Sequence, residues 1–133
     1  MAEAVQEVVD RMFAAFNEQN LEAAVATVTD DSVWIHHGSQ KLVSIRFEGK
    51  SAVEKFFETN FTSMKVEYFE ILSTVVQGDT AIVFGREKFT MADTGEEKAQ
   101  KWVQVYTVRD GLISRMEEYA TSTPDDEYIV VDA

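Results

Sequence analysis

Four long segments rich in β-branched and aromatic residues follow one another in the second half of the chain, with no helical pattern between them. They span residues 64–76, 80–91, 98–109 and 112–121, and the short stretches QGD, ADTG and RDG separate them. The pair Asp110-Gly111 is typical of a tight hairpin turn, which requires left-handed backbone at its centre. Strands joined by turns this short pair antiparallel, so the sequence predicts a four-stranded antiparallel meander.

Three helices are predicted before these strands. Apolar residues recur at helical spacing from residue 3 to about 18, and Asn20 is placed to cap a second, short helix. The third helix is expected to open at Ser51, because Ser51 and Glu54 match a capping box. Between the second and third helices, SVWIHH at 32–37 is predicted to be a strand at or near one edge of the sheet. The expected fold class is therefore α+β, with the helices packed on one face of the sheet.

The composition argues against several classes of function. At 133 residues the chain is the size of one domain, and 24 acidic against 12 basic residues give a formal charge of −12. A surface this negative repels phosphate backbones and anionic lipids, so neither nucleic acid nor a membrane is an expected partner. The absence of cysteine removes disulfides, thiolate nucleophiles and thiolate metal ligands. No apolar run of membrane length and no charged-then-apolar start occur, so a cytoplasmic location is expected.

Three stretches of the chain carry a resemblance to a known superfamily: VVDRMFAAFNEQNLEAAVATVTDDSVW, GKSAVEKFF and WVQVYTVRDGLISRMEEY. Their order resembles the nuclear transport factor 2-like superfamily, especially its SnoaL-like polyketide cyclase, ketosteroid isomerase and limonene epoxide hydrolase branches. The resemblance covers residues 4–121 of a single domain at 1–133, and leaves 122–133 as an acidic C-terminal tail. It implies a cone in which three helices and a strongly curved antiparallel sheet enclose one pocket. This fold hosts many chemistries, so the resemblance does not identify a function.

His36 and His37, the only histidines, stand side by side in the strand predicted at 32–37. Side chains alternate along a strand, so Trp34 and His36 share one face and His37 points to the other. Adjacent histidines therefore cannot readily bind one metal ion together, and neither a metal nor a cofactor is predicted. His36 matches the position of the general-base aspartate of ketosteroid isomerases, and an imidazole there can move a proton near neutral pH. The alternative is a histidine that is hydrogen-bonded at the pocket mouth and has no chemical role.

Two further positions of the isomerases hold different side chains here. Gln104 stands where those enzymes place their oxyanion-stabilising acid, and its amide can donate a hydrogen bond to a developing oxyanion. Met12 stands where they carry a tyrosine donor. With these replacements, ketosteroid isomerisation is not expected.

The epoxide hydrolases provide a second comparison. Arg86 matches their arginine and Glu118 matches their last-strand acid, but Lys88 occupies the position of an aspartate and cannot replace its carboxylate. If Arg86 and Glu118 both face the pocket they are expected to pair, because an unpaired buried charge is unfavourable. The alternative is an ordinary cross-strand ion pair that shapes the sheet.

The alternation of side chains along the predicted strands assigns two faces to the sheet. The inward set is expected to include Ile82, Phe84, Arg86, Lys88 and Glu118. The residues expected to contact a substrate are Met12, Trp34, Phe57, Lys88, Trp102, Tyr106 and Met116. The outer face would carry Val83, Phe89, Val103, Val105, Ile113 and Tyr119. That face is too apolar to leave in water, which predicts a homodimer through the outer face of the sheet.

Three functions remain open at the level of the sequence. The first is a cofactor-independent acid–base enzyme, an isomerase, cyclase, dehydratase or hydrolase acting on a small, partly apolar substrate. In that enzyme His36 would be the base, and Gln104, Arg86 and Glu118 would polarise or orient the substrate. The second is a binding protein that holds a small-molecule ligand without turnover. The third is a dimerisation module with a vestigial pocket, so the sequence does not decide whether the protein is an enzyme.

Overall fold

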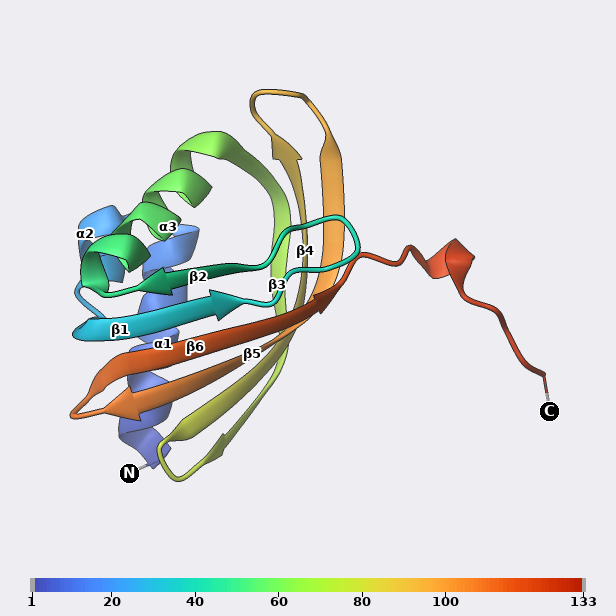
Figure 1. The fold of residues 1–133 in the computed structure, drawn as a ribbon. Coiled ribbons are helices and arrows are strands. Elements are labelled where there is room, and N and C mark those ends of the chain that lie inside the picture. Colours follow the sequence, from blue (N-terminus) through green and yellow to red (C-terminus); the bar gives the residue numbers. More distant parts are fainter. Residues whose placement is uncertain (1, 133) are drawn as a thin grey trace.

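The structure is a computed structural model that describes residues 2–132, and it consists of helices packed against one sheet (Figure 1). The described helices are α1 (Ala2–Asn17), α2 (Leu21–Val25) and α3 (Lys50–Ser63). The strands are β1 (Val28–His36), β2 (Ile45–Glu48), β3 (Met64–Gln77), β4 (Thr80–Met91), β5 (Glu97–Arg109) and β6 (Leu112–Thr121). A short 3-10 helix, η1 (Asp125–Glu127), follows the last strand. The predicted α+β class is confirmed.

The four predicted strands of the second half occur within one residue of their expected bounds, as β3 to β6. They pair antiparallel in chain order, which confirms the meander. At the turn between β5 and β6, Asp110 and Gly111 have φ angles of 53° and 80°. Both values lie in the left-handed region that a tight hairpin turn of this kind requires, so the turn follows directly from these two residues.

The sheet differs from the prediction in its number of strands and in one pairing. Its strand order is β2-β1-β6-β5-β4-β3, which makes six strands, and β2 is an edge strand that the sequence did not indicate. Strand β1 pairs antiparallel with β2 but parallel with β6, so the sheet is mixed and the wholly antiparallel sheet predicted above is wrong. No short turn joins β1 to β6, and turn chemistry therefore carried no information about their relative direction.

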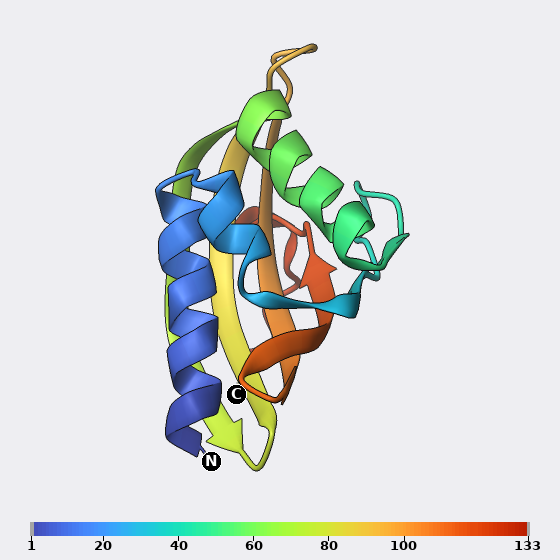
Figure 2. The same ribbon diagram turned by 90° about the vertical axis from the view of Figure 1, so that its left-hand side faces the viewer.

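All three helices lie on one side of the sheet (Figures 1 and 2). The apolar stripe of α1, including Val8 and Met12, is buried against the inner face of the sheet. The predicted cap of α2 is present, because the Asn20 side chain accepts a hydrogen bond from the Ala23 amide at 3.1 Å. The predicted capping box of α3 is wrong: that helix begins at Lys50, and Gly49 is its N-cap.

The two faces of β4 are opposite to those predicted. Ala81, Val83 and Phe89 are buried on the inner face, whereas Arg86 lies on the outer face. The reason is Gly85, which faces inward directly beneath the indole ring of Trp102, where a Cβ atom would overlap that ring. A register shift between β5 and β6 near Val108 also turns Ile113 inward, so its predicted outer position is wrong as well.

The outer face is still partly apolar. Cross-strand pairing places Phe84 beside Val103 and Val103 beside Tyr119, and it places Ile82 beside Val105. Phe84 and Tyr119 are exposed, and the two valines are half-buried. We call Ile82, Phe84, Val103, Val105 and Tyr119 the outer patch.

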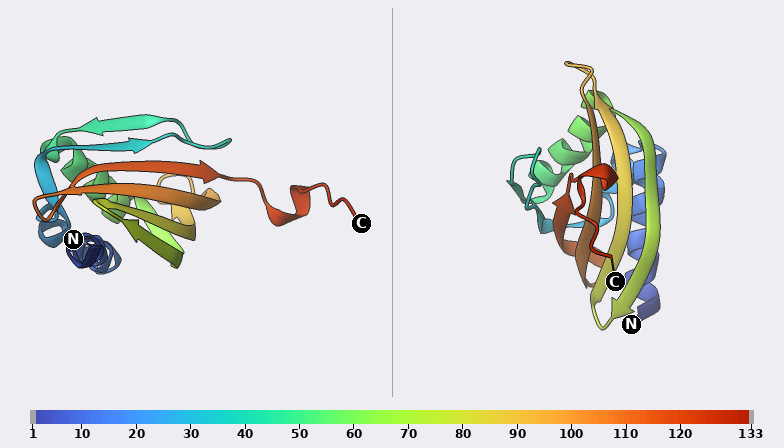
Figure 3. Two further views of the ribbon diagram at one scale, coloured as in Figure 1. Left: turned by 90° about the horizontal axis from the view of Figure 1, so that it is seen from below. Right: turned by 90° about the vertical axis from the view of Figure 1, so that its right-hand side faces the viewer.

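The C-terminal tail leaves the sheet after β6 and runs away from it (Figure 3). Its first part is held by Lys101 of β5, whose ammonium pairs with Asp125 at 2.5 Å and lies 5.3 Å from the ring of Tyr128. Beyond Tyr128 the chain is exposed, and Ile129 reaches 93% exposure. Within residues 2–132, no helix has the length and apolar character needed to cross a membrane.

Candidate functional site

A cavity of about 400 Å³ lies between the helices and the inner face of the sheet. Phenyl rings and methionines from both layers form most of its wall, among them Phe47 of β2, Phe56 of α3 and Met12 of α1. The polar side chains from the sheet that line it are His36, Glu87, Gln100, Gln104, Tyr106 and Glu118. A volume of this size lies in the range of small-molecule sites, and a mostly apolar wall with a few converging polar groups is their usual composition.

Strand pairing brings the polar residues together. His36 of β1 is the cross-strand neighbour of Glu118 in β6, and Glu118 is in turn the neighbour of Gln104 in β5. Glu87 of β4 lies opposite Gln100 of β5. Directly opposite residues project from the same face of a sheet, so these five side chains form one polar group on the cavity wall.

The imidazole of His36 contacts the carboxylate of Glu118. The His36 Nε2 atom lies 2.9 Å from Glu118 Oε2, and the two side chains are only 19% and 6% exposed. A carboxylate can only accept, so Nε2–H donates and the neutral ring carries its lone pair on Nδ1. His36 Nδ1 has no hydrogen-bond partner among the described residues. This arrangement holds the imidazole in the tautomer that a proton acceptor at Nδ1 requires.

Glu87 is the second acid of the site. It lines the cavity, and burial together with the nearby charge of Glu118 raises the pKa of Glu87 to about 8. A hydrogen bond that Gln100 Nε2 donates to Glu87 Oε1 at 2.6 Å opposes this rise in pKa but does not cancel it. Glu87 is therefore mainly protonated at neutral pH and can donate a proton or a hydrogen bond.

Gln100 connects the two acids. Its amide nitrogen also donates to Glu118 Oε1, at 3.3 Å, so one side chain contacts both carboxyl groups. A negative charge on both glutamates at once is unfavourable in this poorly hydrated wall, and the site favours one charged and one protonated carboxyl.

Tyr106 orients Gln104. The Tyr106 hydroxyl donates to Gln104 Oε1 at 2.5 Å, and burial holds the pKa of this phenol well above its usual value. The hydroxyl therefore stays protonated and acts as a fixed donor. Because the Gln104 oxygen is occupied, its Nε2 is the atom left to donate to a ligand in the cavity.

The structure divides the residues expected to form the site into two groups. Met12, Trp34, His36, Phe57, Gln104, Tyr106 and Glu118 line the cavity. Trp102 and Met116 are buried but lie behind the wall, in the core, so their expected contact with a ligand is not supported. Trp102 instead stacks on Phe69, with ring centroids 5.1 Å apart.

Arg86 and Lys88 point away from the cavity, because β4 presents its odd-numbered side chains inward. Arg86 Nε pairs with Glu70 on the outer face at 2.8 Å, and the Lys88 ammonium lies 3.2 Å from Glu97. The expected inward facing of Arg86 and Lys88 is therefore wrong, so the condition for a pair between Arg86 and Glu118 is not met and neither cation can contact a ligand in the cavity. The arginine-based arrangement of the epoxide hydrolases is not reproduced here.

Sequence reasoning missed Glu87 and Gln100. A signal for Glu87 was present, since it is the one charged residue in an otherwise small or apolar set that alternates along β4. A glutamate among small and apolar residues on one face of a strand lies either in solvent or in the wall of a functional site. Which of the two holds depends on whether that face of β4 points toward the core. Gln100 carried no comparable signal.

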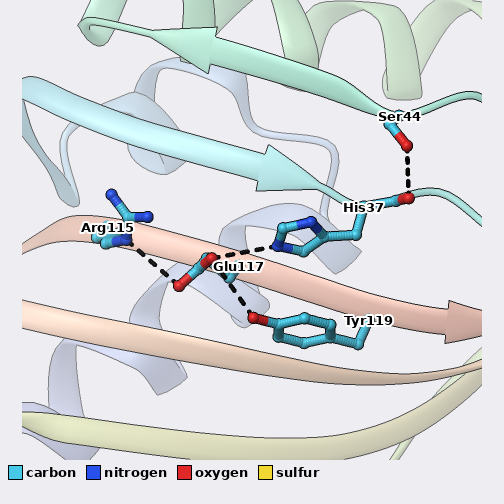
Figure 4. A network of polar contacts seen from close by, with 5 residues as sticks. All are labelled: His37, Ser44, Arg115, Glu117 and Tyr119. Atoms are coloured by element: carbon cyan, nitrogen blue, oxygen red, sulfur yellow. Dashed lines mark hydrogen bonds and ion pairs between the residues drawn. The ribbon is translucent and has the colours of Figure 1, made fainter.

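His37 directly follows β1, and its ring points toward Glu117 and Tyr119 of β6 (Figure 4). Its Nε2 contacts Glu117 Oε1 at 3.1 Å, and its ring stacks on Tyr119 with centroids 4.5 Å apart. The hydrogen bond from His37, with help from Arg115, lowers the pKa of Glu117. The two histidines thus point apart as alternation predicts. Within residues 2–132, no three histidine, aspartate or glutamate side chains gather closely enough to hold a metal ion.

Several solved structures share this fold, among them proteins described as NTF2-like. An NTF2-like protein from Burkholderia xenovorans LB400 has a TM-score of 0.79 and 22% identity, over 90% of this chain and 91% of that one. A protein with a ketosteroid isomerase-like fold from Catenulispora acidiphila DSM 44928, solved with trimethylamine, has a TM-score of 0.72 and 15% identity, over 85% and 84%. An LEH-like epoxide hydrolase from M. tuberculosis has a TM-score of 0.72 and 14% identity, over 90% and 84%. At these identities the likeness shows the fold alone.

The sequence of the chain identifies its family more closely. The family model of the SnoaL-like domain matches residues 9–116, which is most of the chain. The chain therefore belongs to the SnoaL-like domain family. No curated protein sequence matches it.

Proposed function

We propose that this protein is a cofactor-independent acid–base enzyme that moves a proton on a small, partly apolar substrate. The observation that carries the proposal is the pairing of His36 with Glu118 in the wall of an apolar cavity. Glu87, on the same wall, supplies the opposite function, because a carboxyl group with a pKa of about 8 holds a proton at neutral pH. A base and an acid on one cavity wall are the minimum that such chemistry requires.

The proposed proton transfer proceeds in one balanced cycle. His36 Nδ1 accepts a proton from a carbon atom next to a carbonyl group of the substrate, and the electron pair of the broken C–H bond moves onto the carbonyl oxygen. Glu118 stabilises the imidazolium that forms, since it lies 2.9 Å from Nε2. Glu87 or the Gln104 amide donates a hydrogen bond to the oxygen as it becomes negative. When the C=O bond re-forms, the electron pair of the enolate makes a new C–H bond with the proton of the imidazolium at another carbon atom, which restores neutral His36.

The reaction class that follows is an isomerisation, or a dehydration or cyclisation that begins with the same proton abstraction. Two of the structural relatives support a small-molecule site in this fold: one is described as an epoxide hydrolase, and the other was solved with trimethylamine. Epoxide opening through an arginine-assisted mechanism is not proposed, because Arg86 faces outward.

A binding protein without turnover is the second candidate, and one observation favours it. The His36 Nδ1 atom is shielded from solvent as well as unpartnered, so a substrate reaches it only if the wall relaxes. If no such movement occurs, His36 and Glu118 are a polar pair that fixes the orientation of a bound ligand.

The proposed assembly is a homodimer through the outer patch. Aromatic and β-branched side chains of β4, β5 and β6 meet there, and Phe84 and Tyr119 remain exposed in the single chain. A twofold partner would cover them and would leave the cavity, on the other face of the sheet, accessible.

The enzyme proposal is tested by exchange of substrate protons with solvent. We expect the protein to accelerate exchange of the α-protons of small cyclic ketones with D2O, measured by proton NMR across a panel of ring sizes. His36→Gln should abolish the acceleration, while the matched control His37→Gln retains it, because His37 lies on the outer face. If wild type and His36→Gln exchange protons equally, or neither exceeds buffer for any ketone in the panel, the proposal that His36 is the base of an enzyme fails.

A further inference from the structure

The described cavity lining contains two carboxyl groups that no lysine or arginine matches. Glu87 and Glu118 are both in the wall, and no lysine or arginine occurs among its described lining residues. The nearest cation on the same face of β5 is Lys98, two residues before Gln100. Lys98 is not part of the lining, and its ammonium is already paired with Glu96 at 2.8 Å.

Aromatic rings line the same cavity and pack around the imidazole that contacts Glu118. The His36 imidazole that contacts Glu118 packs against Phe56 at 4.7 Å and against Phe47 at 5.9 Å between ring centroids. Trp34, on the same face of β1, lies 5.5 Å from Phe56. The faces of aromatic rings carry negative partial charge and attract cations within about 6 Å. The wall therefore combines carboxyl groups and aromatic rings, the two kinds of group that hold an organic ammonium ion.

We propose that the ligand of this cavity carries a positively charged nitrogen on an apolar body, held between Glu118, Glu87 and the rings of Phe47 and Phe56. The inference rests on the site described under Proposed function and names the substrate class of that site. An ammonium group supplies the positive charge that the described lining of the cavity does not contain.

The alternatives fit less well. An anionic ligand would meet two acids with no lysine or arginine in the described lining, and burying like charges together is strongly unfavourable. A neutral ligand would leave the carboxylate of Glu118, which is 5% exposed, compensated only by His36 and Gln100.

Binding of a cation should be linked to the proton on Glu87. An ammonium beside Glu87 favours its ionised form, so the cation binds best once that proton has left. With a cationic substrate the Gln104 amide, not Glu87, is therefore the donor to the substrate oxygen. The other titratable groups that line the same cavity are Glu118 from β6, His36 from β1 and Tyr106 from β5. Lys98 of β5 lies outside the lining and is paired with Glu96. Affinity for a permanent cation should therefore rise as pH increases through about 8, the pKa of Glu87.

The test uses three probes of matched shape: choline, its neutral isostere 3,3-dimethylbutan-1-ol, and the anion 3,3-dimethylbutanoate. Dissociation constants of the full chain are measured by NMR titration at pH 6, 7.5 and 9. We expect choline to bind about tenfold more tightly than the alcohol at pH 9, and the anion to bind most weakly, as expected for one charge pair of roughly 1.4 kcal/mol. The preference for choline should shrink several-fold at pH 6.

Three variants locate the effect. Glu87→Gln should remove the rise of choline affinity with pH, and Glu118→Gln should lower choline affinity about tenfold while leaving that of the alcohol unchanged. Glu117→Gln is the matched control, because Glu117 adjoins Glu118 in sequence but contacts His37 on the outer face. Circular dichroism establishes that each variant is folded. If Glu118→Gln does not fold, the loss of the pH dependence of choline affinity in Glu87→Gln tests the inference by itself.

The inference is overturned if the wild type binds choline and the alcohol equally tightly, or binds neither. It is also overturned if Glu117→Gln lowers choline affinity as much as Glu118→Gln does. Failure of the inference and failure of the enzyme proposal are distinguishable. If His36-dependent proton exchange persists without a preference for choline, the substrate is not a cation. If choline is preferred without proton exchange, the site is a binding site for cations.

Discussion

Replacing Glu87 with glutamine should change how the stability of the protein depends on pH. The side chain is surrounded by protein on the cavity wall, and its pKa is raised from 4.5 to about 8, chiefly by burial and also by the charge of Glu118. Glutamine has nearly the same shape and retains an oxygen that accepts the hydrogen bond from Gln100, but it cannot ionise. The substitution therefore removes the titration while preserving the packing.

The sign and size of the effect follow from these two pKa values. Between pH 4.5 and about 8 the folded chain holds a proton on Glu87 that the unfolded chain has released, so the free energy of unfolding falls as pH rises. The pKa values differ by about 3.5, and each pKa unit corresponds to about 1.4 kcal/mol, which gives an upper value of about 5 kcal/mol lost by pH 9. Coupling to Glu118 spreads the transition, and a loss of about 3 to 5 kcal/mol is expected.

The assay is urea denaturation at pH 5, 7 and 9 for wild type, Glu87→Gln and the exposed control Glu54→Gln. Subtracting each variant from the wild type cancels the effect of the other acidic groups. We expect Glu87→Gln to be at least as stable as wild type at pH 9 and to lose most of the wild-type decline, whereas Glu54→Gln keeps that decline. If Glu87→Gln keeps the full wild-type pH dependence, Glu87 is not a protonated acid in the folded chain.

Two further predictions concern the sheet. Gly85→Ala should destabilise the protein by about 2 to 3 kcal/mol in urea denaturation, because a Cβ there overlaps the ring of Trp102 and lies 2.6 Å from the backbone oxygen of Glu70. An unchanged urea midpoint would mean that Gly85 does not face the core beneath Trp102. Val105→Asp should convert a species of twice the chain mass into a monomer by light scattering, since the charge falls in the outer patch; a variant that stays dimeric would place the interface elsewhere.

The meander was predictable because its signals are local. Each of the strands β3 to β6 is bounded by its own turn residues, and the Asp110-Gly111 turn needs no distant partner. Strand β2 has no such signal. Its four residues form a strand because they pair with β1, which depends on contacts between segments separated by the loop at 37–44.

The site residues were predictable only in those strands where the sequence indicates which side chains point into the cavity. Alternation along β1 and β5 placed His36 and Gln104 inward and His37 outward, as the structure has them. In β4 the same reasoning chose the wrong face, because it treated Arg86 as a pocket residue and could not foresee that Gly85 must lie beneath Trp102. Glu87 was lost with that choice.

The central claim is that a base and a protonated acid share one cavity wall, and a single NMR titration tests it most directly. The nitrogen shifts of the His36 ring report which nitrogen carries the proton in the neutral form, and the carboxyl carbon of Glu87 reports its own ionisation across pH 3 to 10. We expect the proton of neutral His36 on Nε2, facing Glu118, and a midpoint for Glu87 near 8. A proton on Nδ1, or a Glu87 midpoint near its ordinary value of 4.5, would contradict the claim.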